Sequence, residues 1–430
     1  MALIAFDRFY RDRWLKGQWL APFYLILSLM AGEAGLAFFA FIFSYVLFIH
    51  RGGVWNKMTL LIPYTLLFFS WAALYWINDL GTQGSGMYIN PIGEPLSFLF
   101  LMIQRLPILL FGLFGFLASD LWLLYPPGID TLVLSIALIF LLAFFILLSP
   151  GLKRNRLLRF WLLATVLALL PLSATFPSDR NLIIPGIAGM AILAHLIRLH
   201  VRRFQYRKWV GRAGTTSGKK IRRFSTNLLL IVLFISHLIA APIQRPIRAN
   251  TFRTMMRFIE RSDSFIPSTP EIKRKTVILL NYPFDLLILY LPIFRSFYGI
   301  PGPEKILLLK SGIDEILVNR ISKNTLRIRV PGGYLSHRMD LLFRSPDERM
   351  EVGDRIQLKE MAIKVVEVNS RGMPMELELV FSGSPEDSDF LWLCCRKNLD
   401  LSPFSIPAVG KNVRIKTEID LPAGFRHLFQ

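Results

Sequence analysis

Long runs of apolar residues dominate the first 243 positions of the chain and predict membrane-spanning helices. Residues 131–148, for example, form a run of 18 positions without a charge, which is close to the roughly 20 residues that cross a hydrocarbon layer. A soluble fold has no need for several runs of this kind. The same pattern predicts further spans at residues 58–77, 160–174, 183–199 and 226–241.

The first apolar stretch, residues 17–49, is too long for a single span. As one helix it would extend about 50 Å, whereas the hydrocarbon core measures about 30 Å. Two glycines and a carboxylate, Gly32, Glu33 and Gly35, interrupt it. We therefore expect two short helices that dip into the membrane and return, which brings the predicted total to about seven crossings.

Residues 96–118 are also apolar enough to span a membrane, but Gln104, Arg105 and Pro107 lie in the middle of this segment. Charged and helix-breaking residues are unfavourable at the centre of a lipid-facing span. We leave the segment out of the count and expect it to lie along the outer surface or to re-enter it.

The pattern changes after residue 241. Residues 251–261 place Phe252, Met255, Met256 and Ile259 on one helical face and arginines on another, the signature of an amphipathic helix. Two alternatives fit this face equally well. The helix lies on the outer leaflet, or it packs against the domain that follows.

The tail beyond this helix predicts a compact α/β and β-rich domain. Residues 276–280, 284–297 and 305–309 predict a strand, a helix and a strand, which indicate a βαβ unit. Residues 325–330 and 375–381 then alternate between apolar and charged positions, as half-buried strands do. Asn281, Tyr282 and Pro283 follow the first strand where a nucleotide-binding fold would carry a glycine-rich loop.

These elements predict a polytopic α-helical membrane protein of about seven transmembrane crossings. It carries a C-terminal extracytoplasmic domain with an α/β part and a β-barrel or sandwich. The predicted domains are a cytoplasmic, basic interfacial segment at 1–16, a transmembrane helical domain at 17–243 with an outer loop at 78–128, an interfacial amphipathic linker at 244–272, and the extracytoplasmic domain at 273–430.

Composition and charge agree with a membrane protein and orient it. Hydrophobic residues make up 53% of the chain, and the net charge is +20. Before Ser225 there are 22 Lys and Arg against 8 Asp and Glu, whereas the remainder has 28 against 22. The predicted cytoplasmic loops hold 20 basic residues and the opposite loops only Arg105 and Arg180. By the positive-inside rule, the N-terminus is cytoplasmic and the tail extracytoplasmic, in a bacterial inner (plasma) membrane.

The basic run between residues 202 and 223 also contains three aromatic residues, a combination that nucleic-acid-binding proteins use. Anchoring beside anionic lipid explains both residue types, so we predict the lipid bilayer as the partner and no nucleic acid. The two cysteines, Cys394 and Cys395, are sequence neighbours. A disulfide between them could not link distant segments of the chain. We expect both cysteines to be buried in a strand.

Candidate catalytic groups are few and lie near the predicted outer surface. Glu33, Asp79 and Asp179 are the acids that could serve as a general base or hold a divalent cation. Arg105 and Arg180 are the basic groups that could bind a phosphate. For Asp179 and Arg180 the alternative is structural, as a loop ion pair and a helix cap. The sequence contains no zinc-ligand spacing and no nucleophile elbow.

Residues 27–34 (LSLMAGEA), 175–180 (TFPSDR) and the loop from Gly84-Ser85-Gly86 to Glu94-Pro95 resemble a group of bacterial polytopic proteins. That group is in turn similar to the GT-C glycosyltransferases, which take sugars from polyprenyl-phosphate donors at the outer face of the membrane. GT-C enzymes place their key acid in a first outer loop, and this chain begins downstream of that loop. The resemblance thus implies a relative that lacks the N-terminal catalytic loop.

Two functional hypotheses follow. In the first, the protein is GT-C-like and binds a polyprenyl-phosphate-linked sugar above Glu33, with Asp79 or Asp179 as base or metal ligand and Arg105 or Arg180 at the phosphate. In the second, it is a non-enzymatic anchor or scaffold of the bacterial envelope, whose C-terminal domain binds a protein or glycan partner. The sequence makes no prediction of the oligomeric state.

Overall fold

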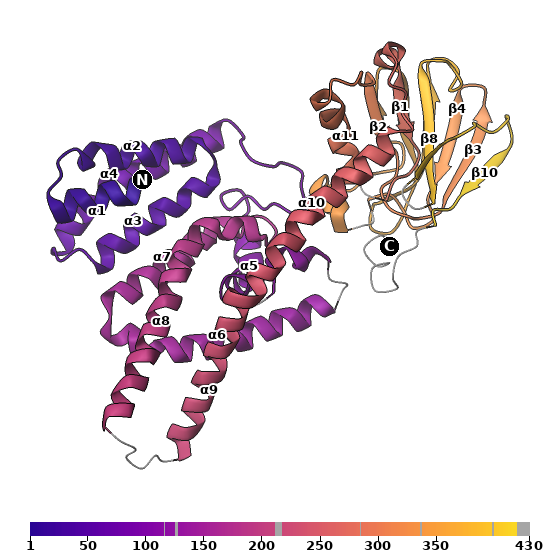
Figure 1. The fold of residues 1–430 in the computed structure, drawn as a ribbon. Helices are drawn as coiled ribbons and strands as arrows, with labels where there is room; N and C mark the ends of the chain where they lie inside the picture. The colour runs from indigo at the N-terminus through magenta and orange to yellow at the C-terminus, as the bar shows by residue number, and fades with distance from the viewer. Residues whose placement is uncertain are drawn as a thin grey trace. The chain divides into compact units, whose positions relative to one another are not determined.

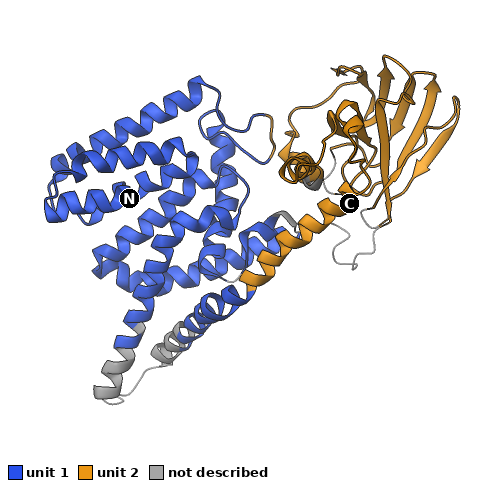
Figure 2. Ribbon diagram, turned by 45° about the horizontal axis from the view of Figure 1, so that its top comes forward, with its two compact units in different colours: residues 1–83, 87–243 blue, residues 84–86, 244–430 orange. Residues whose placement is uncertain are grey.

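The computed structural model describes residues 1–115, 117–124, 128–210, 217–283, 285–335, 338–397 and 400–418. The first part of the chain is helical and the last part is rich in strands (Figure 1). The chain divides into two compact units (Figure 2). Unit 1 comprises Met1–Gln83 and Met87–Ile243, and unit 2 comprises Gly84–Gly86 and Gln244–Gln430.

Unit 1 is all-helical over its described residues. Its elements are α1 (Ala2–Asp12), α2 (Gly17–Met30), η1 (Glu33–Gly35), α3 (Leu36–Phe48), α4 (Val54–Ile77), α5 (Pro95–Phe114), η2 (Ser119–Leu124), α6 (Ile129–Arg154), α7 (Arg156–Leu172), η3 (Asp179–Leu182), α8 (Ile183–Val210), α9 (Ser217–Phe234) and the π-helical η4 (Ile235–Ala240).

The predicted break in the first apolar stretch is confirmed. Helix α2 ends at Met30 and α3 begins at Leu36, with the short η1 between them. Gly32 adopts φ +140°, a backbone conformation that side chains disfavour. A Cβ atom at Gly35 would lie 2.5 Å from the Ser28 carbonyl oxygen. Both glycines are thus required for the tight return, and each helix measures only about 20 Å.

Within the part of the chain that the structure describes, five helices are long and apolar enough to cross a membrane: Val54–Ile77, Pro95–Phe114, Ile129–Arg154, Asp179–Leu199 and Asn227–Asp263. Large apolar side chains cover their outer surfaces; Ile139, for example, is 70% exposed and Leu142 63%. Such surfaces mark a membrane-embedded protein, because water would not stabilise them.

The set of five differs from the predicted spans in three places. It lacks residues 160–174, which lie in the 17-residue α7, it lacks the two short helices of the first stretch, and it includes α5. We left residues 96–118 out of the count because of Gln104, Arg105 and Pro107, yet α5 is an unbroken helix of 20 residues through all three. Its buried face packs on α6, where Phe114 stacks on Phe144 with ring centroids 4.5 Å apart. Length and composition alone therefore place α5 among the candidate spans.

The described residues of unit 2 form two α-helices, two short 3-10 helices and ten strands. They are α10 (Ala241–Asp263), η5 (Pro270–Arg274), β1 (Thr276–Leu279), α11 (Asp285–Phe297), β2 (Lys305–Leu308), β3 (Ile316–Ser322), β4 (Thr325–Arg329), η6 (Arg338–Leu342), β5 (Arg355–Gln357), β6 (Met361–Val368), β7 (Pro374–Phe381), β8 (Phe390–Lys397), β9 (Asp400–Pro403) and β10 (Asn412–Ile415).

The strands form two sheets. One has the order β2-β1-β8-β9, and the other has the order β10-β3-β4-β7-β6-β5. Strand β1 pairs in parallel with β2, and α11 connects them, which confirms the predicted βαβ unit. The larger sheet is antiparallel throughout its recorded pairings.

Unit 2 has three layers, which are helices α10 and α11, the smaller sheet and the larger sheet, and a core lies between each layer and the next. The first core lies between the sheets and includes Ile278, Leu326, Leu379 and Trp392. The second lies between the smaller sheet and helices α10 and α11. Successive residues of β8 alternate between them, so Cys394 faces the first core and Cys395 the second. The prediction that both thiols are buried is confirmed.

Helix α10 belongs to the fold of unit 2. Ile259 is buried in the second core, and Met255 and Met256 pack against it. Of the two alternatives for this apolar face, the structure has the packing against the C-terminal domain. Unit 2 consequently begins at Gln244, earlier than the predicted domain at 273–430, and most of the predicted linker lies inside it.

Candidate functional site

Glu33 lies at the turn between α2 and α3 and is half-buried. Its carboxylate accepts a short hydrogen bond from the Tyr75 hydroxyl, near the end of α4. The Tyr75 hydroxyl in turn lies 3.2 Å from that of Tyr88, in the segment that follows α4. Burial raises the pKa of the Tyr88 phenol. Glu33 is therefore held by a pair of neutral phenols rather than by a cation.

Arg105 lies in the middle of α5 and is buried, with 8% exposure. One terminal nitrogen donates to the carbonyl oxygens of Ser173 at 3.2 Å and Ala174 at 2.9 Å. The other donates to the Met87 carbonyl at 3.2 Å. The guanidinium thus ties α5 to the chain that follows α4 and to the end of α7. A charge in this position is stabilised because all three acceptors are carbonyls of loop backbone, outside the hydrogen bonding of the helices.

Asp179 and Asp120 form a reciprocal pair of backbone caps. The Asp179 carboxylate accepts from the Ser119 amide at 2.7 Å, and the Asp120 carboxylate accepts from the Asp179 amide at 3.2 Å. Each acid therefore binds the first turn of the other's short helix, η2 or η3. This matches the capping alternative for Asp179, although the helix end that it caps is not its own.

The remaining two predicted residues lie apart from these contacts. Asp79 is exposed on the turn after α4, where it adopts a positive φ of 47°. Arg180 is exposed, and its Nε lies 3.4 Å from the Ser178 hydroxyl. Among the described contacts, neither side chain approaches Glu33 or Arg105.

Residues 87–89 connect the groups that do converge. Tyr88 reaches toward Tyr75 and Glu33, the Met87 carbonyl accepts from Arg105, and the Ile89 amide donates to Ala174 at 2.9 Å. Glu33 and Arg105 are therefore joined through Tyr75 and the two consecutive residues Tyr88 and Met87. Sequence reasoning missed Tyr75 and Tyr88, because tyrosines near the end of a span are ordinary interface anchors.

The described residues contain no group of three or more His, Cys, Asp or Glu side chains that could hold a metal ion. The acids predicted for a divalent cation are instead dispersed: Glu33 on Tyr75, Asp179 on η2, and Asp79 on an exposed turn. The cluster is best described as a hydrogen-bonded junction of loops and helix ends.

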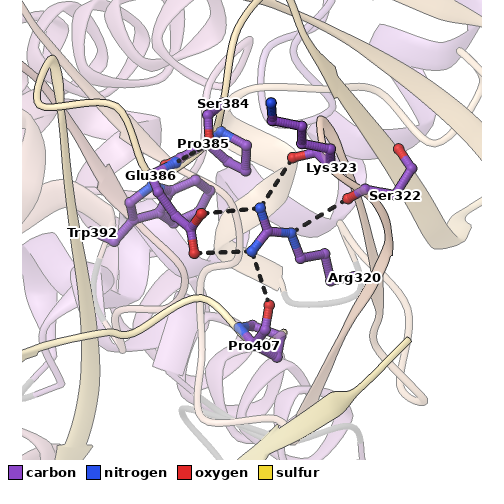
Figure 3. A network of polar contacts seen from close by, with 8 residues as sticks. All are labelled: Arg320, Ser322, Lys323, Ser384, Pro385, Glu386, Trp392 and Pro407. Carbon is purple, nitrogen blue, oxygen red and sulfur yellow. Dashed lines mark hydrogen bonds and ion pairs between the residues drawn. The ribbon is translucent and has the colours of Figure 1, made fainter. Parts of the chain in front are cut away.

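Unit 2 contains its own polar network around Arg320 of β3 (Figure 3). The guanidinium donates to both oxygens of Glu386 at 2.9 and 3.1 Å. It also donates to the backbone carbonyls of Ser322, Lys323 and Pro407. All five of its N–H groups are thereby used within the fold. We interpret this Arg320 network as structural, because it holds β3 to the segments that contain Glu386 and Pro407.

The stability that the Arg320 network provides decreases at low pH. The hydrogen bond from Arg320 lowers the pKa of the Glu386 carboxyl below its ordinary value. The ion pair therefore stabilises unit 2 above the ordinary pKa of a carboxyl group, and its contribution is lost as the pH falls through the lowered value.

The carboxyl end of β1, where a nucleotide-binding fold carries its phosphate loop, is filled by side chains. The Asn281 amide donates to the Cys395 carbonyl at 2.8 Å and accepts from the Cys395 amide at 3.0 Å. Tyr282 is fully buried, with its hydroxyl 2.6 Å from that of Ser262. These contacts lock β1 to β8 and to α10 at the position where a phosphate would bind.

A test of the junction replaces Arg105 with methionine, which is of similar length but has no donor. We expect Arg105→Met to destabilise unit 1 by at least about 2 kcal/mol, because each buried acceptor left without a partner costs about 1–3 kcal/mol. The measurement is the thermal midpoint of the full chain in detergent. Arg180→Met is the matched control, because Arg180 is exposed. Equal midpoints for the two variants would refute the structural role of Arg105.

Comparisons with protein-family models, with curated proteins and with solved structures find no match to this chain. The resemblance to GT-C glycosyltransferases therefore remains an expectation from the sequence, and the argument for function depends on the geometry described above.

Proposed function

We propose that the protein is a non-enzymatic scaffold of the bacterial envelope, anchored in the inner membrane, whose C-terminal unit binds a protein or glycan partner on the extracytoplasmic side. The observation that carries the proposal is that the candidate catalytic groups form hydrogen bonds with the chain's own backbone. Arg105 binds three backbone carbonyls, and Asp179 caps η2. Groups committed to the chain's own backbone hold a fold together, and they are poorly placed to bind substrate.

The anchor itself is supported by the last candidate span. Helical backbone continues from α9 through η4 into α10, and the candidate span covers Asn227–Asp263. The far end of that segment, at Ile259, is part of the core of unit 2. A membrane helix built into the core of a domain fixes that domain close to the membrane.

The outward orientation is supported by the contacts on both sides of α5. Before the helix, Ile89 donates to Ala174; after it, Ser119 donates to Asp179. Residues 174 and 179 belong to one short connection between α7 and α8. The chain on both sides of α5 therefore contacts the same connection, and in this proposal α5 lies along or re-enters the outer surface without crossing the membrane. That arrangement keeps the 20 basic loop residues on the cytoplasmic side.

Cysteine labelling tests this placement of α5. Ile92 and Ile129 flank α5 and are 54% and 44% exposed. We expect cysteines at both positions to react with a membrane-impermeant maleimide in intact spheroplasts. The unaltered chain is the control, because Cys394 and Cys395 are buried. If only one position reacts before permeabilisation, then α5 crosses the membrane and the proposed orientation is wrong.

A second candidate function, the transfer of sugar from a polyprenyl-phosphate donor, is favoured by one observation. Glu33 is half-buried at a break between two short apolar helices, and its recorded partner is a phenol rather than a cation. A carboxylate in that position retains an oxygen that could accept a proton.

Turnover of polyprenyl-phosphate-sugars by the full chain in vesicles separates the two functions. The scaffold proposal predicts no release of polyprenyl phosphate above that of protein-free vesicles, and no difference between the unaltered chain and Glu33→Gln. Asp79→Asn, on an exposed turn, is the matched control. Release that disappears with Glu33→Gln and persists with Asp79→Asn would establish the enzyme and refute the scaffold.

A further inference from the structure

Helix α11 of unit 2 is apolar on both of its faces. One face packs in the second core, with Ile288 and Leu291 buried beside strand β1. The opposite face is open. Its exposed residues are Leu289 (54%), Tyr290 (46%), Ile293 (61%), Phe297 (81%) and, just beyond the helix, Tyr298 (55%). Leu289, Ile293 and Phe297 follow one another at intervals of four and form a continuous stripe.

A stripe of this kind is unusual on a domain surrounded by water. A helix that is apolar all round is expected to be covered on both sides, and a contiguous exposed apolar patch marks an interaction surface. The apolar segment Ile288–Phe297 is too short to span a membrane. The occupant must therefore cover the helix from one side.

We propose that the stripe on α11 is a membrane-docking surface, which inserts into the interface between lipid headgroups and acyl chains. Two observations identify lipid as the occupant. The first is continuity with the membrane anchor. Helix α10, which forms the last part of the candidate span Asn227–Asp263, is bound to the buried face of α11 through the ion pair between Asp263 and Arg295 at 3.3 Å. The stripe is thus tethered to a segment that already lies in lipid, so its local concentration at the membrane is high.

The second observation is charge. Residues 244–300, which include α10 and α11, hold nine Lys and Arg and four Asp and Glu, a net charge of +5. Residues 301–430 hold 19 and 18, a net charge of +1. The basic excess of unit 2 is therefore confined to its helical part, where Arg253, Arg257 and Lys273 are exposed. Exposed basic residues on the same helical part of a domain as exposed aromatic and aliphatic side chains are the combination that binds an anionic membrane surface.

The candidate span Asn227–Asp263 contains two points at which the helix can change direction. The π-helical turn η4 covers Ile235–Ala240, and Pro246 lies inside α10. π-turns and prolines are the usual causes of bends in long helices. Such a bend would allow α11 to lie against the membrane while α10 remains attached to it. The inference depends on the proposed function only for the membrane anchor, and not for the side on which unit 2 lies.

Fluorescence quenching in proteoliposomes tests the docking surface. The full chain carries a single added cysteine at Ile293 or Phe297, labelled with an environment-sensitive NBD dye. The vesicles contain phosphatidylethanolamine and phosphatidylglycerol, with or without lipid that bears a nitroxide at the fifth acyl carbon. Val409, which is 55% exposed in unit 2, is the matched control position. We expect a blue-shifted dye and at least twofold stronger quenching at residues 293 and 297 than at residue 409.

Three results would overturn the proposal. Equal quenching at all positions would show that the stripe faces water. A blue-shifted dye without quenching by nitroxide lipid would show that protein covers the stripe. A signal that disappears when the protein-to-lipid ratio is lowered would identify a second copy of the chain as the occupant. Because the dye reports lipid contact on either side of the membrane, failure here is distinguishable from a wrong orientation of unit 2.

Discussion

Removing either partner of the buried ion pair between Asp263 and Arg295 should destabilise unit 2 strongly, whereas removing both should not. The Arg295 side chain is fully buried and that of Asp263 is 9% exposed, with 3.3 Å between Nε and Oδ1. Asp263→Ala leaves the guanidinium in the core without its counterion, a change that typically costs about 3–5 kcal/mol.

The direction of both pKa shifts predicts the result of the double substitution. Burial raises the pKa of Asp263 and lowers that of Arg295, and in each case it outweighs the attraction between the partners. The charged pair is therefore less favourable than its short distance suggests. We expect Asp263→Leu combined with Arg295→Met to recover most of the loss, because no uncompensated charge remains. A cost of about 1–3 kcal/mol should persist, because the Pro267 carbonyl, which accepts from Arg295 at 2.8 Å, loses its donor.

Hydrogen–deuterium exchange of the full chain in detergent provides the measurement. Amides of β1 and α11 report the local free energy of opening in the region that the pair holds together. Lys359→Ala, which removes an exposed ion pair with Glu304, is the control and should change exchange very little. A double variant whose loss equals the sum of the two single losses would contradict this account.

The same pair predicts a pH dependence. Because burial holds the pKa of Asp263 above its ordinary value, folding favours the protonated acid. The associated stability is fully present below the ordinary carboxyl pKa of about 4 and is lost as the pH rises through the raised value. In the Arg295→Met variant, which lacks the counterion, this loss should be larger than in the unaltered chain. Replacing Asp263 with asparagine in that variant should abolish it.

Local patterns in the sequence predicted the features that depend on neighbouring residues. The turn at Gly32 and Gly35 follows from two properties of glycine: the backbone conformation at Gly32 disfavours a side chain, and the close approach of the Ser28 carbonyl leaves no room for one at Gly35. The alternation from Thr325 onward placed Leu326 and Ile328 in the core, and both are buried. The βαβ unit and the burial of Cys394 and Cys395 followed from strand periodicity in the same way.

Features that depend on distant residues could not be predicted. Arg105 was expected to bind phosphate, but its acceptors are backbone carbonyls 68 and 69 positions away. Because every residue has a backbone carbonyl, the sequence does not show which carbonyls will accept from Arg105. The bond between Tyr75 and Glu33 also joins residues 42 positions apart. For the same reason α5 tolerates a charge at its centre: the connection after α7 supplies oxygen atoms that no pattern within α5 reveals.

The chain segments that make up unit 2 could not be predicted for the same reason. The three residues Gly84–Gly86 belong to this unit, where the Ser85 hydroxyl donates to the Leu341 carbonyl at 3.1 Å. The predicted domain boundary at residue 273 could not include them, because sequence-based boundaries follow composition along the chain. These residues lie in the predicted outer loop at 78–128, which agrees with the proposed extracytoplasmic position of unit 2.

The side of the membrane on which unit 2 lies is the central claim of this account, and it has an all-or-none readout. Val409 represents unit 2 and is 55% exposed. Gly53 represents the predicted cytoplasmic loop before α4, and a Cβ atom there would contact nothing within 4 Å. Single cysteines at the two positions are labelled with an impermeant maleimide in intact spheroplasts and again after permeabilisation. We predict that residue 409 reacts fully in intact spheroplasts and that residue 53 reacts only after permeabilisation; the reverse result would contradict the proposed orientation.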